Sequence, residues 1–294
     1  MSARPPIVHP GPAARERHAL AWAAAVPLDF TLARGEAAEA GLARAVAAAG
    51  CDSACIEISG GRFDPFRYVL PAASPDGDHA AWYSATVVPE GGVTIDRATA
   101  VVGRRDGVGF VHCHGLWRDA AGRPALGHML PPESFAAENV HVRGVGLSGA
   151  MFESRHDPET NFRLFAAETA LSGETREGSA LAVTLRPNQD ISWALEAICR
   201  DAGIGRASIL GIGSLNGARF ESGLEMESYA SEFFITGGRL EEAPDGARVR
   251  LDIAVVAMDG AIFSGRLVRG ENPICVTAEL VVLPEPAVPL SRAD

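Results

Sequence analysis

Two histidines in the first half of the sequence are spaced so that a β-strand would direct both to the same side. His112 and His114 lie in residues 110–115, a mostly apolar segment in which every second position from His112 is polar. This alternation predicts a strand. On a strand, His112 and His114 point to one face and Cys113 points to the other.

A turn signal follows and predicts where a third histidine lies. Residues 119–123 are small or polar and include a glycine, which is typical of a hairpin turn. A hairpin centred on this segment places His114 opposite His128, with His112 diagonal to the pair. Three imidazoles that leave room for water are the ligands of a catalytic type of zinc site. The sequence therefore predicts a divalent metal, with zinc as the first choice, on His112, His114 and His128. Buried histidines that only satisfy backbone groups are the alternative.

Such a site would perform a restricted range of chemistry. Zinc on three imidazoles lowers the pKa of bound water to about 7 and polarises a carbonyl or phosphoryl oxygen. Metal-dependent hydrolysis or hydration of a small molecule is the activity that follows, although no residue stands out as the general base. The candidates for contact with a substrate are Arg62, His141 and Trp117, and Trp82 and Tyr83 are further aromatic residues that could wall a pocket. Each also has an ordinary structural alternative.

The elements that would position these residues occur twice along the chain. A strand, a helix ending at a glycine and a second strand follow one another in each half, at an offset of 153 residues. The first set is predicted at 30–33, 35–49 and 53–58, and the second at 183–185, 189–202 and 207–213. An internal duplication explains this order. One helix with several strands per copy predicts an α+β (α/β) fold in which a mostly antiparallel sheet packs on one main helix.

The histidine hairpin also has a counterpart, but its chemistry differs. Residues 252–254 and 265–267 correspond to 112–114 and 127–129, at an offset of 138 to 140 residues. They supply Asp252, Ala254 and Arg266, which are too few donors for a metal and predict a salt bridge across the hairpin. The first copy also holds about 13 extra residues near the loop at 71–79.

The length and composition set the organisation of the chain. Its 294 residues are enough for two hydrophobic cores. The predicted parts are a tail at 1–18, a first domain at 19–168 with the histidines, a linker at 169–178, a second domain at 179–284 without them, and a tail at 285–294. The net charge of −11 argues against a surface built to neutralise phosphates.

The expected location is the cytoplasm. The five cysteines are odd in number and lack Cys-x-x-Cys spacing, which favours a reducing compartment over a disulfide framework. No apolar run is long enough to span a membrane. The alanine-rich run at 19–26 follows two arginines like a signal peptide, but it is short and leads directly into the first predicted strand.

Short motifs in both halves resemble the plant and prokaryote conserved (PPC) domain, which is known in plants beside AT-hook segments. They lie at 185–190, 211–215, 258–260 and 277–283 in the second half, and at 61–63, 112–114 and 127–128 in the first. The resemblance implies two tandem PPC-like domains with a curved sheet, assembled as a homo-oligomer that is usually a trimer. It also implies, from some prokaryotic members, a metal held by histidines that match His112, His114 and His128.

The same resemblance raises DNA binding as an alternative function. An AT-hook needs an Arg-Gly-Arg-Pro core whose arginines enter the minor groove. The only similar string here is 122–124, within the hairpin turn, so nucleic acid is not favoured. A structural oligomerisation module with a metal needed for folding is the third possibility.

Overall fold

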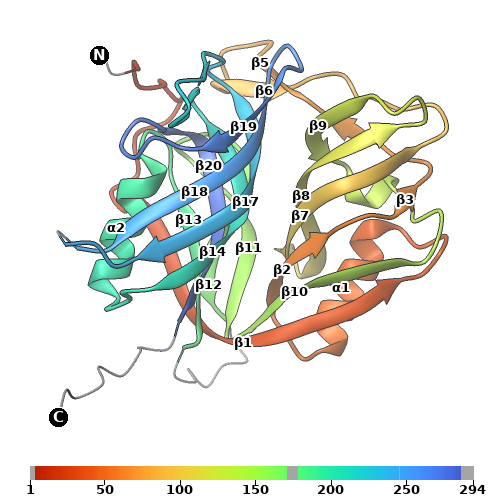
Figure 1. Ribbon diagram of the computed structural model, residues 1–294, viewed down its shortest axis with the longest axis horizontal. Helices are drawn as coiled ribbons and strands as arrows, with labels where there is room; N and C mark the ends of the chain where they lie inside the picture. Colours follow the sequence, from red (N-terminus) through yellow and green to blue (C-terminus); the bar gives the residue numbers. More distant parts are fainter. Residues whose placement is uncertain (1–3, 171–177, 245, 286–294) are drawn as a thin grey trace.

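The computed structural model describes residues 4–170, 178–244 and 246–285. Within these residues most of the chain forms one 16-stranded sheet, accompanied by two small two-stranded sheets and two α-helices (Figure 1). Neighbouring strands are antiparallel except for a single parallel residue pair between β7 and β11. The predicted mostly antiparallel sheet is therefore found.

The first half of the chain supplies long strands of the main sheet and several short strands. Its elements are β1 (His18–Leu32), α1 (Ala38–Ala48), β2 (Ser53–Ile58), β3 (Arg62–Phe63), β4 (Tyr68–Val69), β5 (Pro71–Ala73), β6 (Ala81–Tyr83), β7 (Val93–Arg105), β8 (Val108–Asp119), β9 (Pro124–Met129), the 3-10 helix η1 (Pro131–Glu133), β10 (Val140–Ser148), β11 (Ala150–His156) and β12 (Arg163–Thr169).

The second half repeats the principal elements. They are β13 (Ala180–Leu185), α2 (Ile191–Asp201), β14 (Ala207–Leu215), β15 (Ala218–Arg219), β16 (Glu225–Met226), β17 (Ser231–Glu241), β18 (Arg248–Ala257), β19 (Ile262–Arg266) and β20 (Ile274–Pro284). The sheet order is β1-β10-β2-β7-β8-β9 in the first half and β13-β20-β14-β17-β18-β19 in the second. β10 lies between β1 and β2, as β20 lies between β13 and β14. The two halves thus share one strand order.

Both helices end at the predicted glycines, but each begins two or three residues later than predicted, at Ala38 and Ile191. The Asp190 side chain accepts a hydrogen bond from the Trp193 amide at 2.9 Å and caps the start of α2. Gly50 and Gly203 follow the two helices with φ of +69° and +71°, the left-handed conformation that stops a helix at low cost.

The first strand starts earlier than the sequence suggests. β1 begins at His18 rather than near Phe30, so the alanine-rich run is a strand. Its first part pairs with β13, and its second part pairs with β10. Ala21 and Ala23 are buried there, between the two halves of the sheet. β1 therefore joins the halves, and the sheet runs continuously through it.

The sheet folds so that its two halves face each other, with a helix on each outer side. The α1 residues pack against one face of the first half, and the α2 residues pack against one face of the second. A third core lies between the opposite faces and combines residues such as Val101 and Leu126 with Phe234 and Val281. Figure 1 shows the two halves side by side, with β1 crossing from one to the other. Side chains that alternate along each strand therefore enter two different cores.

The predicted N-terminal tail is irregular but attached. Residues 4–17 contain no helix or strand, yet the Ile7 amide donates to Asn188 Oδ1 at 2.8 Å and His9 Nε2 lies 2.9 Å from the Cys275 carbonyl oxygen. The predicted linker at 169–178 and tail at 285–294 lie almost entirely outside the described residues. Within the described part of the chain, neither helix has the length and apolar character needed to cross a membrane.

Candidate metal centre between the two halves

The predicted hairpin is formed by β8 and β9, and its register is the predicted one. His114 pairs with His128, and Cys113 pairs with Met129. Asp119 stabilises the turn, because its Oδ1 accepts hydrogen bonds of 2.9 Å from the amides of Ala121 and Arg123. Cys113 enters the core beneath α1. His112 and His114 therefore face the other half of the sheet.

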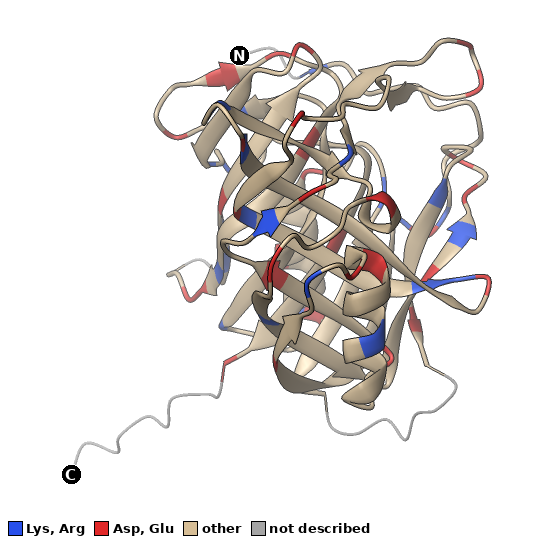
Figure 2. Cartoon of the chain, turned by 90° about the vertical axis from the view of Figure 1, so that its right-hand side faces the viewer, with Lys and Arg blue, Asp and Glu red and all other residues tan. Residues whose placement is uncertain are grey.

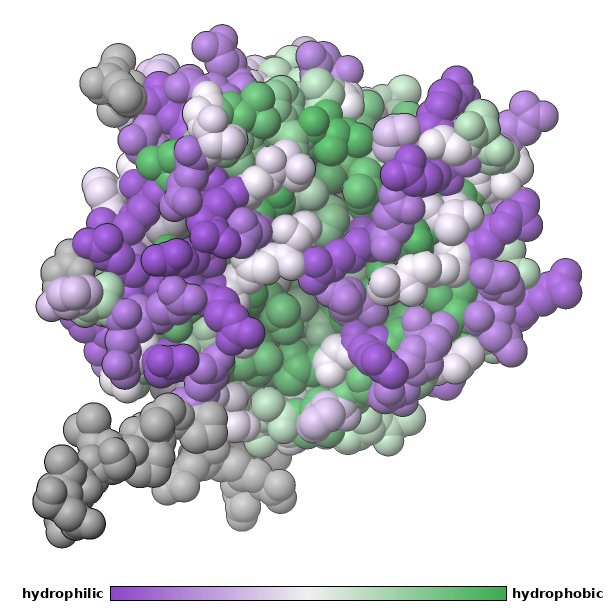
Figure 3. Space-filling model, viewed as in Figure 1, coloured by the Kyte–Doolittle hydropathy of each residue, from purple (hydrophilic) through white to green (hydrophobic). Residues whose placement is uncertain are grey.

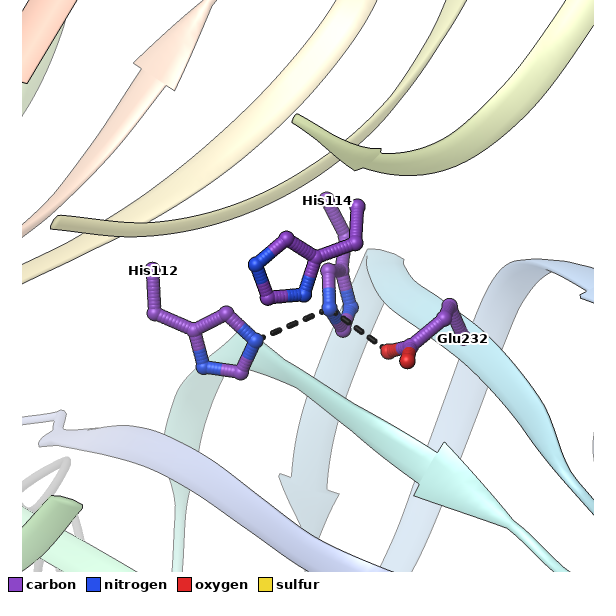
Figure 4. A group of neighbouring side chains, drawn as sticks. His112, His114 and Glu232 are labelled. Atoms are coloured by element: carbon purple, nitrogen blue, oxygen red, sulfur yellow. Dashed lines mark hydrogen bonds and ion pairs between the residues drawn. The ribbon is translucent and has the colours of Figure 1, made fainter. Parts of the chain in front are cut away.

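The three imidazoles meet two carboxylates that come from the second half. One nitrogen of each histidine and a carboxylate oxygen of Glu232 on β17 all lie within 4.8 Å of one another. Glu232 Oε2 is 2.7 Å from His114 Nε2, and Glu279 Oε2 on β20 is 3.0 Å from His112 Nδ1. Figure 4 shows His112, His114 and Glu232 converging from facing strands. The centre is thus completed only where the halves meet.

The hydrogen bonds around the imidazoles determine where their lone pairs point. His114 Nδ1 lies 2.9 Å from the Phe233 carbonyl oxygen, which can only accept, so Nδ1 carries the proton. His112 Nδ1 faces the Glu279 carboxylate and is a donor for the same reason. The two Nε2 atoms are 2.9 Å apart, and His114 Nε2 also lies 2.7 Å from the Glu232 carboxylate. Either a proton on one Nε2 or a cation shared by the nitrogens and Glu232 satisfies this arrangement.

This arrangement fits a metal ion. Metal-bound histidines commonly donate their other ring nitrogen to a carboxylate or a backbone carbonyl, which fixes the tautomer. Glu279 and the Phe233 carbonyl fill these two roles. Ligands 2.0–2.1 Å from a tetrahedral zinc ion lie about 3.3 Å apart, so the Nε2 atoms of His112 and His114, now 2.9 Å apart, need to separate by only a few tenths of an ångström. His128 Nδ1 is buried without a hydrogen-bond partner in the described part of the chain.

The charges of the centre act differently on two of the imidazoles. Burial lowers the pKa of His112, but the carboxylates of Glu279 and Glu232 outweigh it and raise that pKa above its ordinary value. Burial and the neighbouring His112 and His114 lower the pKa of His128 well below its ordinary value. His128 is therefore neutral at physiological pH, as a metal ligand must be.

A cavity of about 390 Å³ adjoins the histidines. His112, His128 and Glu232 line it, together with Trp82 and Tyr83 from β6. Burial is the main cause of a raised pKa of the Tyr83 hydroxyl, which is neutral at physiological pH. On the face shown in Figure 3, hydrophobic residues gather along the middle, between the two halves, and hydrophilic ones flank them. Residues between Pro71 and Tyr83 thus form one wall of this cavity.

The other predicted contact residues lie elsewhere. Arg62 pairs with Asp64 at 2.9 Å, and His141 pairs with Asp29 at 2.6 Å. Trp117 is fully buried in the core under α1. These three side chains do not line the cavity. Arg62 and His141 form ion pairs near the surface, and Trp117 packs in the core. Trp82 and Tyr83, in contrast, line the cavity.

Sequence reasoning missed Glu232 and Glu279. Each is an acidic residue within an otherwise apolar strand, at 231–235 and 277–283, and each is buried. A charge at an inward-facing strand position is unusual, and that signal was present in the sequence. Its partners lie more than 100 residues away, so no local spacing connects them.

The hairpin of the second half contains the predicted salt bridge. Arg266 Nη2 lies 3.0 Å from Asp252 Oδ2, and the two residues pair directly across β18 and β19. The register corrects the sequence alignment, because Asp252 and Arg266 both lie seven positions from the middle of their turn, as His114 and His128 do. Asp252 is therefore the counterpart of His114, not of His112.

Comparison with known proteins finds a family match in the second half of the chain. Residues 172–285 match the family model described as the Plants and Prokaryotes Conserved (PCC) domain. The second half of the chain is therefore similar to the PCC domain. The resemblance to the PPC family is confirmed for this half, and β13 to β20 lie within the matched residues. No curated protein matches the chain.

Several solved structures are also similar to parts of the chain. A metal-containing protein from Archaeoglobus fulgidus is 19% identical over 50% of this chain and 96% of its own, with a TM-score of 0.40. A PPC protein from Pyrococcus horikoshii is 16% identical over 54% and 100%, also with a TM-score of 0.40. A protein from Ralstonia eutropha JMP134, provisionally named as DNA-binding, is 17% identical over 48% and 90%, with a TM-score of 0.34. At these scores they carry no argument about the function of this chain.

Proposed function

We propose that the chain is a metal-dependent enzyme in which His112, His114 and His128 hold a divalent metal ion, with zinc as the first choice. The observation that carries this proposal is the convergence of one nitrogen from each histidine and a Glu232 carboxylate oxygen within 4.8 Å of one another. A purely structural role would leave His128 Nδ1 buried without a hydrogen-bond partner among the described residues.

The proposed reaction is hydrolysis or hydration of a small molecule in the adjoining cavity. A metal on neutral imidazoles supplies an activated water and polarises a carbonyl or phosphoryl oxygen. Glu232 provides the general base that the first half lacks, because its carboxylate is buried beside the three nitrogens and lines the cavity. Glu279 holds the His112 ring so that Nε2 faces the centre.

In this proposal the first half is a second, diverged PCC-like unit. The shared strand order of the two halves supports a tandem origin. The histidines lie in one unit and the carboxylates in the other, so both are needed. The homo-oligomer and the cytoplasmic location implied by the sequence remain proposals, and light scattering of the purified chain measures the first of them.

Elemental analysis of the purified protein tests the metal. We expect close to one equivalent of metal per chain, and less than a tenth of that in His114→Ala. Arylester hydrolysis by the wild type should disappear with a chelator and return with zinc. A folding role would instead show as loss of the first half's structure when metal is removed, since a catalytic site can be emptied while the fold remains.

DNA binding is the second candidate, and the PCC match is what favours it. The net charge of −11 opposes it. On the side shown in Figure 2 the basic and acidic residues are interspersed. Phosphate contacts would make the affinity fall steeply with salt, so a salt-titrated DNA-binding assay distinguishes the two functions.

A further inference from the structure

The cavity beside the histidines has an aromatic wall that reaches the centre itself. Trp82 and Phe162 stack with ring centroids 5.4 Å apart. Tyr83 contacts the His128 ring edge-on at 5.1 Å and the Phe162 ring at 6.3 Å. All four side chains line the same cavity. A flat, apolar molecule can therefore lie along this wall with one end at the histidines.

The opposite side of the cavity leads away from the histidines along β8. Phe110 lies two residues before His112 on the same face, which separates the two by about 7 Å along the strand. Its ring meets that of Phe165 at 5.6 Å, and both rings line the cavity. The length of a benzene ring with one substituent matches this span.

An arginine without a carboxylate partner stands at the far end. The Arg105 guanidinium lies over the Phe110 ring, 5.5 Å from its centroid, and lines the cavity. Among the residues that the structure describes, no carboxylate lies within ion-pair distance of it. Arg163 also lines the cavity, but its charge is already paired with Asp106 at 2.7 Å. Arg105 is thus available for an anionic group of a ligand.

We propose that this cavity binds a small aromatic carboxylate, with the ring between the two aromatic walls and the carboxylate on Arg105. The reacting group then lies at the histidine centre, so this inference rests on the proposed function for its reaction but not for its binding. The orientation follows from charge. Glu232 and Glu279 surround the histidine end with negative charge, whereas Arg105 offers an unpaired positive charge at the other end.

Calorimetric titration of the full-length protein with benzoate tests the proposal. The matched variants are Arg105→Gln and Arg104→Gln, because Arg104 is the neighbour whose side chain alternates to the other face of β7 and does not line the cavity. We expect Arg105→Gln to weaken benzoate binding about fivefold, as for a partly exposed ion pair. Arg104→Gln should bind as the wild type does. Benzamide, which has no charge, should bind both variants equally.

Cyclohexanecarboxylate, which has the same charge but no aromatic ring, completes the design. We expect it to bind more weakly than benzoate because it cannot stack on the aromatic walls. The proposal is overturned if the wild type does not bind benzoate, if both variants bind it equally well, or if the two carboxylates bind alike. The metal content of the same preparations tests the histidine centre separately, so either idea can fail while the other stands.

Discussion

The hairpins β8–β9 and β18–β19 occupy equivalent places in the two halves and present different chemistry at the same register. His114 and His128 form the cross-strand pair in one, and Asp252 and Arg266 form it in the other. The ion pair is satisfied within its own hairpin at 3.0 Å. The two imidazoles instead bring ring nitrogens within 4.8 Å of one another, of His112 and of the Glu232 carboxylate. The same cross-strand position thus holds a salt bridge in one half and part of the candidate metal centre in the other. The residue types at that position decide which of the two forms.

The charged residues that surround each hairpin also differ. The histidines face Glu232 and Glu279, which are both buried. Beside the Asp252–Arg266 pair lies Arg97, whose guanidinium donates to the Thr236 carbonyl oxygen at 2.7 Å and pairs with Glu57. Around hairpin β18–β19 each charged side chain is therefore neutralised by its own partner. Around hairpin β8–β9 the carboxylates instead act on imidazoles that share a single centre.

The largest effect is expected from Glu232, the carboxylate that the second half places beside the histidines. Glu232→Gln keeps the shape of the side chain and removes its basicity. We expect kcat for arylester hydrolysis to fall by about 10²- to 10⁴-fold, the usual contribution of a general base, while the metal content stays at the wild-type level. Steady-state kinetics and elemental analysis of one preparation measure both. Loss of the metal would show instead that Glu232 is a ligand.

A smaller effect is expected at the carboxylate that orients His112. Glu279→Gln should weaken metal binding about 10- to 100-fold, the typical cost of losing the outer partner of a metal-bound histidine. Competition with a chromophoric chelator gives the affinity. Asp252→Asn is the matched control in the second hairpin and should leave the metal affinity unchanged. Equal losses in both variants would contradict the division of roles between the hairpins.

A polar cluster that also joins the halves should respond to pH without any metal. Burial raises the pKa of Asp157 and of Glu159, but hydrogen bonds from Arg186 to the first and from Arg17 to the second lower both below their ordinary values of 3.8 and 4.5. The stability that these carboxylates contribute is present above those values and is lost as the pH falls through the lowered ones. We expect the urea midpoint to decrease between pH 6 and pH 3.

The Asp157→Asn variant isolates this contribution. It should lower the free energy of unfolding by about 1–2 kcal/mol at pH 6 and flatten the pH dependence, because the amide that replaces the carboxylate does not titrate. Urea unfolding followed by circular dichroism at the two pH values measures it. An unchanged slope between pH 6 and pH 3 would show that Asp157 does not contribute.

The smallest effect is expected at the salt bridge of the second hairpin. Asp252 and Arg266 are each about 39% exposed, so water screens their attraction. A double-mutant cycle of Asp252→Asn and Arg266→Gln should give a coupling of about 0.2–1 kcal/mol, as for exposed pairs. A much larger coupling would mean that this hairpin depends on its charges as strongly as the first depends on its histidines.

The parts of the fold that depend on local sequence were predictable. The β2 strand at 53–58, both helices and the β8–β9 register follow from alternation, glycine stops and turn residues. The start of β1 was not predictable in this way, because alanines have no strand preference of their own. They occupy this strand because Ala21 and Ala23 fit the narrow space between the facing halves.

The site was predictable only as far as one hairpin could position it. His112, His114 and His128 lie together because a turn of known type sets their register. Glu232 and Glu279 reach them through packing of one half of the sheet against the other, which no spacing along the chain encodes. The predicted contact residues Arg62, His141 and Trp117 were chosen by proximity in sequence or by residue type, and they lie elsewhere for the same reason.

X-ray absorption spectroscopy of the zinc-loaded protein at the zinc edge tests the shared centre most directly. The proposed site predicts three imidazole nitrogens at about 2.0–2.1 Å and one further light ligand, and the imidazole signal should be reduced in His128→Ala. A spectrum with sulfur neighbours at about 2.3 Å, or with fewer than three imidazoles in the wild type, would contradict it.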